Sequence, residues 1–318
     1  MNIIFAGTPE FAVASLEKLI NSGNQIAAVI SAPDKPAGRG CKMKESEVTQ
    51  FAKKVGLTVL CPENLSEPDF ISKISTMKPD LLVVVAFRKL PGKLWSLPTH
   101  GTINLHASLL PQYRGAAPIN RAIMNGEVET GLTTFFINDH IDCGEIIDNV
   151  RLPIGINETA GELHDRMKVA GAELLEKTVQ AISEGNAVSH KQDDFIGTKH
   201  DALRPAPKLN KETARIKWHD DLWVVHNHIR GLSPYPGAWT EFISPEGKRH
   251  FVKIYRSEAI ASPHNLTTGS IITDPIFHLK IAVNQGFIVP KVLQQAGKKQ
   301  MDIAEFVRGF PVSEKWEC

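Results

Sequence analysis

Residues 103–118 read INLHASLLPQYRGAAP, and the rest of the sequence is organised around this stretch. Its first residues alternate like a short strand, so Asn104 and His106 share one face while Ile103 and Leu105 point the other way. Serine, proline and glycine follow and predict a loop. An amide and an imidazole therefore lie side by side at the carboxyl end of a predicted strand, where open α/β sheets bind ligands.

A histidine at a strand end is often structural or solvated, so His106 alone does not decide a function. A second polar stretch strengthens the functional interpretation. Residues 133–137 read TTFFI, which predicts another strand, and NDHIDCG follows at 138–144 with the carboxylate of Asp142.

Strands and helices alternate along the first half of the chain, which predicts a doubly wound, mostly parallel sheet with helices on both faces. The turn after the first strand holds a single glycine, Gly7, and so lacks the dinucleotide-binding fingerprint. We expect Thr8 to cap the helix that follows and Pro9 to take its first position. The predicted strands are 2–6, 25–31, 57–60 and 80–86, and the predicted helices are 10–22, 46–55 and 68–77.

The composition and the pattern of predicted elements change after a long predicted helix at 159–184. Residues 185–211 are polar and contain two prolines, which predicts a linker. Five short strand-like runs after a helix at 220–231 predict a smaller β-barrel of the oligonucleotide-binding (OB-like) kind. The expected domains are 1–184, with a Rossmann-like fold, and 212–318. The aromatic side chains of Tyr235, Trp239 and Phe242 either stack on bases or belong to the core.

Composition excludes several classes of protein. The longest apolar run, residues 81–87, is too short to cross a bilayer. For this reason we expect no membrane partner. The four cysteines lack metal-ligand spacing, so we expect free thiols in a reducing cytoplasm and no metal. Residues 204–318 carry 16 Lys and Arg against 11 Asp and Glu, whereas the rest carries 20 against 24. This basic excess is weak support for a nucleic-acid partner.

Several motifs in fixed order resemble the signature of the folate-dependent formyltransferases. The central ones are Asn104 with His106, the Ser108–Pro111 turn, and Asp142 with Gly144. Within that family the chain is similar, over nearly its full length, to the branch that formylates methionyl-tRNA. The other matching segments are 3–11, 36–40, 114–118, 214–216, 233–236 and 295–299.

The resemblance implies transfer of a formyl group from 10-formyltetrahydrofolate to the α-amino group of initiator methionyl-tRNA, the step that prepares this tRNA for translation initiation. Such acyl transfer needs no covalent nucleophile, because a neutral amine attacks directly. Asn104 and a protonated His106 would donate hydrogen bonds to the tetrahedral oxyanion. Asp142 would orient the imidazole, favour its protonated form and relay protons through a water molecule.

The resemblance also assigns binding residues. The folate contacts are expected at Ser108, Leu109, Leu110 and Pro111, and at Phe87 and Leu90 of a loop that departs from the family pattern by lacking a glycine. The tRNA contacts are expected at Arg39, Lys42, Lys208 and Arg215. Residues 32–44 are basic and hardly apolar, so they form either a surface loop or an arm that orders on RNA. A monomer is expected.

Two alternatives stay open at this point. A related formyltransferase acting on a sugar nucleotide or a purine precursor would have nearly the same first domain. An RNA-binding protein that has lost catalysis would explain the altered Phe87–Pro91 loop. The basic second domain favours the tRNA-formylating branch over the first alternative, and the presence of Asn104, His106 and Asp142 argues against the second.

Overall fold

The computed structural model describes residues 1–37, 42–195, 203–274, 278–310, 312 and 316–318. It divides into two compact units, neither of which is continuous in sequence. Unit 1 comprises residues 1–115, 131–152 and 164–205, and unit 2 comprises residues 116–130, 153–163 and 206–318. No helix in the described part of the chain is long and apolar enough to cross a membrane.

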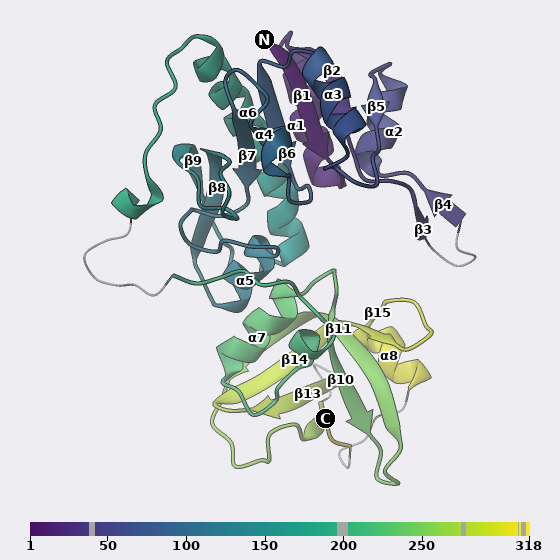
Figure 1. The fold of residues 1–318 in the computed structure, drawn as a ribbon. Helices are drawn as coiled ribbons and strands as arrows, with labels where there is room; N and C mark the ends of the chain where they lie inside the picture. The colour runs from purple at the N-terminus through teal and green to yellow at the C-terminus, as the bar shows by residue number, and fades with distance from the viewer. Residues whose placement is uncertain (38–41, 196–202, 275–277, 311, 313–315) are drawn as a thin grey trace. The chain divides into compact units, whose positions relative to one another are not determined.

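A seven-stranded sheet of order β5-β2-β1-β6-β7-β8-β9 forms the centre of unit 1 (Figure 1). Its first five strands run parallel, and β8 runs antiparallel to β7. The doubly wound, mostly parallel fold predicted from the sequence is therefore confirmed. In chain order the strands are β1 (Asn2–Gly7), β2 (Gln25–Ile30), β5 (Val59–Leu60), β6 (Leu81–Val85), β7 (Thr102–His106), β8 (Glu129–Phe136) and β9 (Ile146–Pro153).

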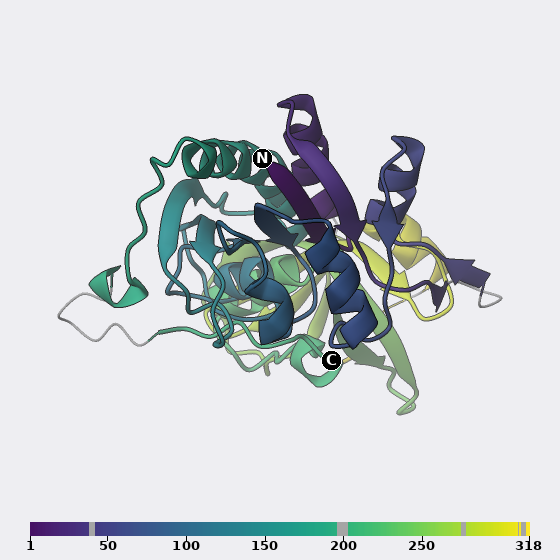
Figure 2. The ribbon, with the colours of Figure 1, turned by 45° about the horizontal axis from the view of Figure 1, so that its top comes forward.

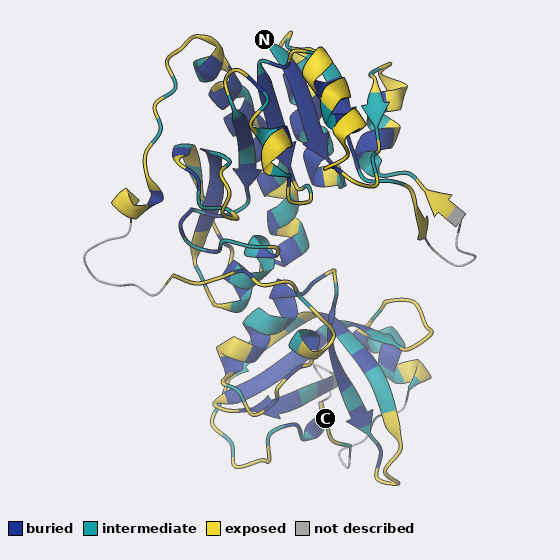
Figure 3. Ribbon diagram, in the orientation of Figure 1, coloured by how far each residue is buried: buried dark blue, intermediate teal, exposed yellow. Residues whose placement is uncertain are grey.

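Helices cover both faces of this sheet, with α3 and α4 on one side and α1 and α6 on the other (Figure 2). The central strands β1, β6 and β7 are mostly buried, whereas the edge strand β9 is largely exposed or half-buried, and the helices expose their outward faces (Figure 3). The helices are α1 (Glu10–Asn21), α2 (Glu47–Lys54), α3 (Pro68–Thr76), α4 (Gly92–Trp95), α5 (Pro118–Met124) and α6 (Ala160–Ser183).

The start of α1 differs from the prediction. Pro9 is the N-cap residue, α1 begins at Glu10, and no side chain caps it, so the expected Thr8 cap is wrong. The backbone carbonyl of Thr8 instead accepts from the amide of Val48 at 3.4 Å, which ties the turn to α2. Ser46 provides the cap that the sequence did not single out, because its side chain accepts from the amide of Thr49.

Two short strands lie in the basic segment expected to be a loop. They pair as an antiparallel hairpin on either side of residues 38–41. Residues 38–41 lie outside the described part of the chain, and with them the predicted tRNA contact Arg39. The strands are β3 (Lys35–Ala37) and β4 (Lys42–Lys44).

Unit 2 is built on a curled antiparallel sheet of order β10-β11-β14-β13-β12, with β15 paired to β14. Helix α7 (Leu222–Gly231) packs on it, and α8 (Ile303–Gly309) is a helix that the sequence analysis missed. Glu317 pairs with both Ile243 and Ser270, so the end of the chain bridges the two edge strands. The expected small barrel corresponds to this sheet. Its strands are β10 (Ala238–Ile243), β11 (Arg249–Ala261), β12 (Ile271–Asp274), β13 (His278–Val283), β14 (Gly286–Gln295) and β15 (Met301–Asp302).

Candidate active site

Strand β7 carries Asn104 and His106 on one face, as its alternation predicts. Asn104 pairs in register with Val84, which packs among the residues beneath α3 and α4. Leu105 points the other way, where its side chain lies against Gly171 of α6. The amide of Asn104 is half-buried, and the imidazole of His106 is 7% exposed. The two polar side chains therefore project together at the end of a buried central strand.

Hydrogen bonding fixes the tautomer of His106. Its Nε2 lies 2.9 Å from the carbonyl oxygen of Tyr113. A carbonyl only accepts, so Nε2 carries a hydrogen and donates it. The other nitrogen, Nδ1, lies 3.8 Å from Oδ2 of Asp142. Nδ1 is therefore the nitrogen that faces the carboxylate.

Asp142 is held in a tight loop between β8 and β9. Its backbone is left-handed, with φ at 54°, a conformation that aspartate tolerates better than most residues. Its Oδ2 accepts a hydrogen bond from the amide of Gly115 at 2.9 Å, and its side chain is 13% exposed. Gly144 is required two residues later, because a Cβ there would lie 1.6 Å from the carbonyl oxygen of Phe136.

The turn after β7 is tied to β8 by polar contacts. The Ser108 hydroxyl donates to the carbonyl of Gln112 at 2.6 Å, and the Ser108 carbonyl accepts from Thr133 at 2.7 Å. Thr133 in turn accepts from the amide of Leu110 at 3.1 Å. Ser108 is fully buried, so its hydroxyl serves the turn, consistent with the absence of a nucleophile elbow around it.

The six residues expected to contact folate lie on the two loops at this end of the sheet. Leu109 is half-buried against Gly131, and Leu110 packs with Phe135 and Ile146 in a small apolar cluster. Pro111 is buried, Leu90 is 5% exposed, and Phe87 is half-buried at the edge of the cluster beneath α3 and α4.

The described residues expected to contact tRNA are divided between the two units. Lys208 and Arg215 are exposed in unit 2, and the Arg215 guanidinium lies over the Trp239 ring at 5.4 Å and 3.9 Å from Glu241. Lys42 begins β4 in unit 1. Trp239 is 8% exposed and Phe242 is fully buried, so both belong to the core, whereas Tyr235 is 83% exposed.

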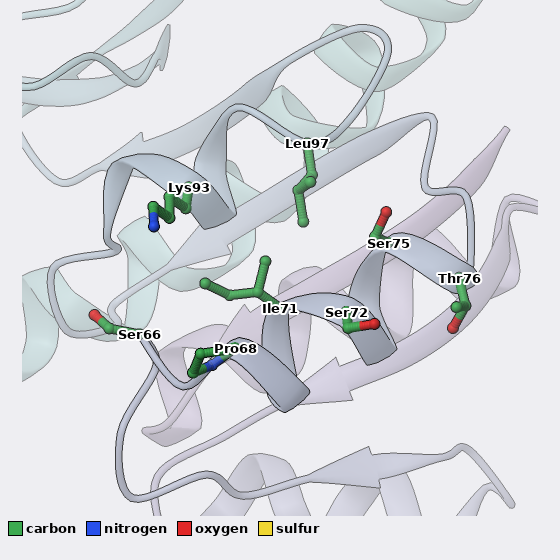
Figure 4. A pocket seen from close by; sticks show the side chains of 8 residues that line it. All are labelled: Ser66, Pro68, Ile71, Ser72, Ser75, Thr76, Lys93 and Leu97. Atoms are coloured by element: carbon green, nitrogen blue, oxygen red, sulfur yellow. The ribbon is translucent and has the colours of Figure 1, made fainter.

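A hollow of about 450 Å³ lies elsewhere in unit 1, between α3 and α4 (Figure 4). Ile71 and Leu97 point toward one another across it, and Lys93 lies at its edge. Its lining has no carboxylate and no imidazole, so it lacks the groups that acid–base chemistry needs. Among the described residues, no cluster of three or more His, Cys, Asp or Glu is placed to hold a metal ion.

Two residues that bind the loops around His106 and Asp142 were not singled out from the sequence. Thr133 follows the alternation of β8 and gave no separate signal. Gln192 lies in the segment predicted to be a linker, where it forms a short 3-10 helix with the next residues and is 3% exposed. Its amide donates to the carbonyls of Asp142 and Gly144. A single buried glutamine in a polar segment leaves no pattern that a sequence reading detects.

The sequence patterns of two families cover most of the chain. The formyl transferase family matches residues 1–179, and the formyl transferase C-terminal domain matches residues 208–311. A methionyl-tRNA formyltransferase of Bacteroides fragilis is 47% identical over all of this chain and 97% of its own length. The chain belongs to the methionyl-tRNA formyltransferase family. The relative of that name in Flavobacterium johnsoniae is 44% identical over 99% of this chain and 98% of its own.

Two solved structures share the fold. An N-formyltransferase of Helicobacter canadensis, crystallised with folinic acid and dTDP-3-aminofucose, superposes with a TM-score of 0.64 at 23% identity. The match covers 93% of this chain and 99% of that chain. HypX of Aquifex aeolicus, solved with tetrahydrofolic acid, gives a TM-score of 0.60 at 18% identity over 99% of this chain and 48% of its own. At these identities the likeness establishes the fold alone.

Proposed function

We propose that this chain transfers the formyl group of 10-formyltetrahydrofolate to the α-amino group of initiator methionyl-tRNA, producing N-formylmethionyl-tRNA for translation initiation in the cytoplasm. The observation that carries the proposal is the full-length identity of 47% to a methionyl-tRNA formyltransferase, together with Asn104, His106 and Asp142 meeting at one strand end. The amino-sugar alternative is disfavoured, since two structures solved with a sugar nucleotide or named for sugar formylation are 23% and 20% identical, against 47% for the methionyl-tRNA formyltransferase.

The reaction is a direct acyl transfer. The neutral amino nitrogen attacks the formyl carbon, and a tetrahedral intermediate with a negatively charged oxygen forms. The Asn104 amide and the Nδ1 hydrogen of a protonated His106 donate to that oxygen, since Nε2 is already committed to the Tyr113 carbonyl. The bond from carbon to N10 of the folate then breaks, N10 takes up a proton, and the amine loses one.

Asp142 moves the proton between these two nitrogens. The distance of 3.8 Å from its Oδ2 to Nδ1 of His106 is longer than a direct hydrogen bond, so a water molecule or a reacting group bridges the two. The Gly115 amide keeps the carboxylate in place while it acts. This arrangement suits transfer without an acyl-enzyme intermediate. Asn104 and His106 serve as hydrogen-bond donors and Asp142 serves as the proton relay, so none of the three acts as a nucleophile.

We place the folate between the loop at 86–91 and the turn at 108–111. Phe87, Leu90, Leu109, Leu110 and Pro111 would pack on it, and Ser108 would act by holding the turn. We place the tRNA on Arg39, Lys42, Lys208 and Arg215, within a monomer organised as a catalytic domain (1–184), a linker (185–211) and a tRNA-binding domain (212–318). Lysine and arginine suit tRNA because it is a polyanion.

One assay tests the reaction and its residues together. The chain is incubated with 10-formyltetrahydrofolate and either charged initiator tRNA or an amino-sugar nucleotide, and formyl transfer is measured. We expect transfer to the charged tRNA alone. His106→Ala and Asn104→Ala should each lower kcat about 100- to 1,000-fold with little change in folate affinity. Preferred transfer to the sugar would refute the substrate, and near-normal kcat in either variant would remove that residue from the mechanism.

A further inference from the structure

The segment after α6, predicted to be a plain linker, returns to the catalytic loops. His190 pairs with Ile146 at the start of β9 through two backbone hydrogen bonds of 2.8 Å. Gln192 follows two residues later and is buried. At residues 204–205 the same segment lies against the turn after β7. It therefore meets both loops of the candidate active site within unit 1.

Every polar atom of the Gln192 side chain is engaged. Nε2 donates to the carbonyl oxygens of Asp142 at 2.9 Å and Gly144 at 2.8 Å. Oε1 accepts from Nε of Arg114 at 3.0 Å and from Nη2 at 2.6 Å. Because a guanidinium only donates, Arg114 fixes which end of the amide faces the Asp142 loop. Gln192 thus binds both residues that flank Cys143, and we call this set of hydrogen bonds, from Arg114 through Gln192 to Asp142 and Gly144, the clamp.

The other end of the segment acts on the His106 side. The Arg204 carbonyl accepts from the Tyr113 amide at 2.7 Å, and the Arg204 amide donates to Oε1 of Gln112 at 2.9 Å. The carbonyl of the same Tyr113 accepts from Nε2 of His106. The orientation of the imidazole is therefore connected through one residue to this segment.

Both anchored loop residues have strained backbones. Asp142 has φ at 54° and Tyr113 has φ at 59°, in the left-handed region that non-glycine residues seldom adopt. Such conformations persist where surrounding contacts hold them, and they gather at functional sites. The Asp142 carbonyl and the Tyr113 amide are the groups that the segment binds. The contacts thus fall on two of the five non-glycine residues with positive φ in the described part of the chain, and these two flank the candidate active site.

We propose that Gln192 is a positioning residue for catalysis, which holds the Asp142 carboxylate against His106 from the segment that joins the two domains. This inference rests on the proposed function, since it takes Asp142 to be the proton relay. Gln192 touches no reacting atom. It acts by fixing the backbone carbonyls of Asp142 and Gly144, and a displacement of the Asp142 carboxylate by about 1 Å costs on the order of 100-fold in rate.

Two substitutions separate the parts of the clamp. Gln192→Met keeps the volume and removes every hydrogen bond. Gln192→Glu keeps acceptors for Arg114 but cannot donate to the carbonyls of Asp142 and Gly144. Gln180→Met makes the same chemical change on the exposed face of α6 and serves as the control. We expect both Gln192 variants to lower kcat by about 10- to 100-fold with KM for folate within about threefold, and the control to match the unmodified chain.

A spectroscopic readout follows the carboxylate itself. The Gly115 amide donates to Oδ2 of Asp142, and a charge-assisted hydrogen bond shifts its proton resonance downfield. This resonance is observed in protein labelled with ¹⁵N-glycine and is assigned by its response to Asp142→Asn. In both Gln192 variants we expect it to move upfield and its hydrogen exchange to accelerate. A general loss of stability does not move this one resonance selectively.

The outcomes are decisive in both directions. A fall in kcat together with a displaced Gly115 resonance supports the clamp. Near-normal kcat in Gln192→Glu, or a Gly115 resonance that stays in place, overturns it. If the unmodified chain fails to formylate charged tRNA, the proposed function fails, while the Gly115 comparison still decides whether Gln192 holds the Asp142 carboxylate. Kinetics and spectra are recorded well below the thermal midpoint of each variant, so that the folded state is compared.

Discussion

Acidification should destabilise unit 2 through the buried His226 of α7. Its ring is 1% exposed, Nε2 donates to Oδ1 of Asn157 at 3.0 Å, and Nδ1 accepts from the Ser257 hydroxyl at 3.2 Å. Burial, with a smaller contribution from the nearby Arg230 guanidinium, lowers the pKa of His226 from 6.5 to about 4, against opposing contributions from the Ile156 backbone and Glu258. The folded protein therefore keeps this imidazole neutral under conditions in which the unfolded chain protonates it.

The sign and size follow from linkage. Because the folded pKa is the lower one, the stabilising contribution is fully present above pH 6.5 and is lost as the pH falls toward 4. Between pH 7.5 and 5.0 the loss amounts to about 2 kcal/mol of unfolding free energy. The lower limit of pH 5.0 keeps most carboxylates outside the titration.

Denaturant unfolding followed by tryptophan fluorescence measures this loss. Four of the five tryptophans lie in unit 2, at positions 218, 223, 239 and 316, so the signal reports mainly on that unit. His226→Gln is the matched variant, since glutamine does not titrate. We expect the unmodified chain to lose about 2 kcal/mol more than the variant over this pH range. Other groups, including the buried His228, cancel in the difference. Equal losses in the two proteins would refute the assignment.

Three further outcomes test the site and the binding surface. Asp142→Asn should lower kcat about as much as loss of His106 and alter the pH–rate profile, because an amide relays no proton; an unchanged profile would contradict the relay. Gly144→Ala should destabilise unit 1 by about 1–3 kcal/mol in thermal or denaturant unfolding, because the Phe136 carbonyl occupies the space that a Cβ needs. Lys208→Ala with Arg215→Ala should raise KM for charged tRNA and flatten its salt dependence by about one unit of slope for each lost phosphate contact, with folate affinity unchanged.

The polar pair at the strand end was predictable from the residues. Alternation alone sets Asn104 and His106 on one face of β7, and the loop-forming residues after them mark the carboxyl end of the strand. The parallel sheet follows in the same way from alternating strands and helices. Asp142 needed the family resemblance, because its approach to His106 depends on the antiparallel pairing of β8 with β7, which periodicity does not reveal.

Other features leave no local signal. Residues 116–130 and 153–163 group with unit 2 although they precede the predicted linker, because long-range packing decides compactness. The linker composition at 185–211 is polar, as a spacer would be, yet Gln192 and Arg204 within it bind the catalytic loops. A hydrogen bond from one side chain to a carbonyl far away in the sequence produces no periodic pattern and no fixed residue spacing. Such hydrogen bonds become visible only when the chain is folded.

The distribution of strain argues that the segment after α6 serves chemistry rather than stability. Left-handed backbone costs on the order of 1–2 kcal/mol at a residue such as Tyr113 and less at an aspartate such as Asp142. An acyl transfer without a covalent nucleophile relies on donors that are set before the reaction begins. In this chain, hydrogen bonds from the segment after α6 hold the left-handed residues Asp142 and Tyr113. These two residues in turn position the candidate catalytic side chains before the reaction begins.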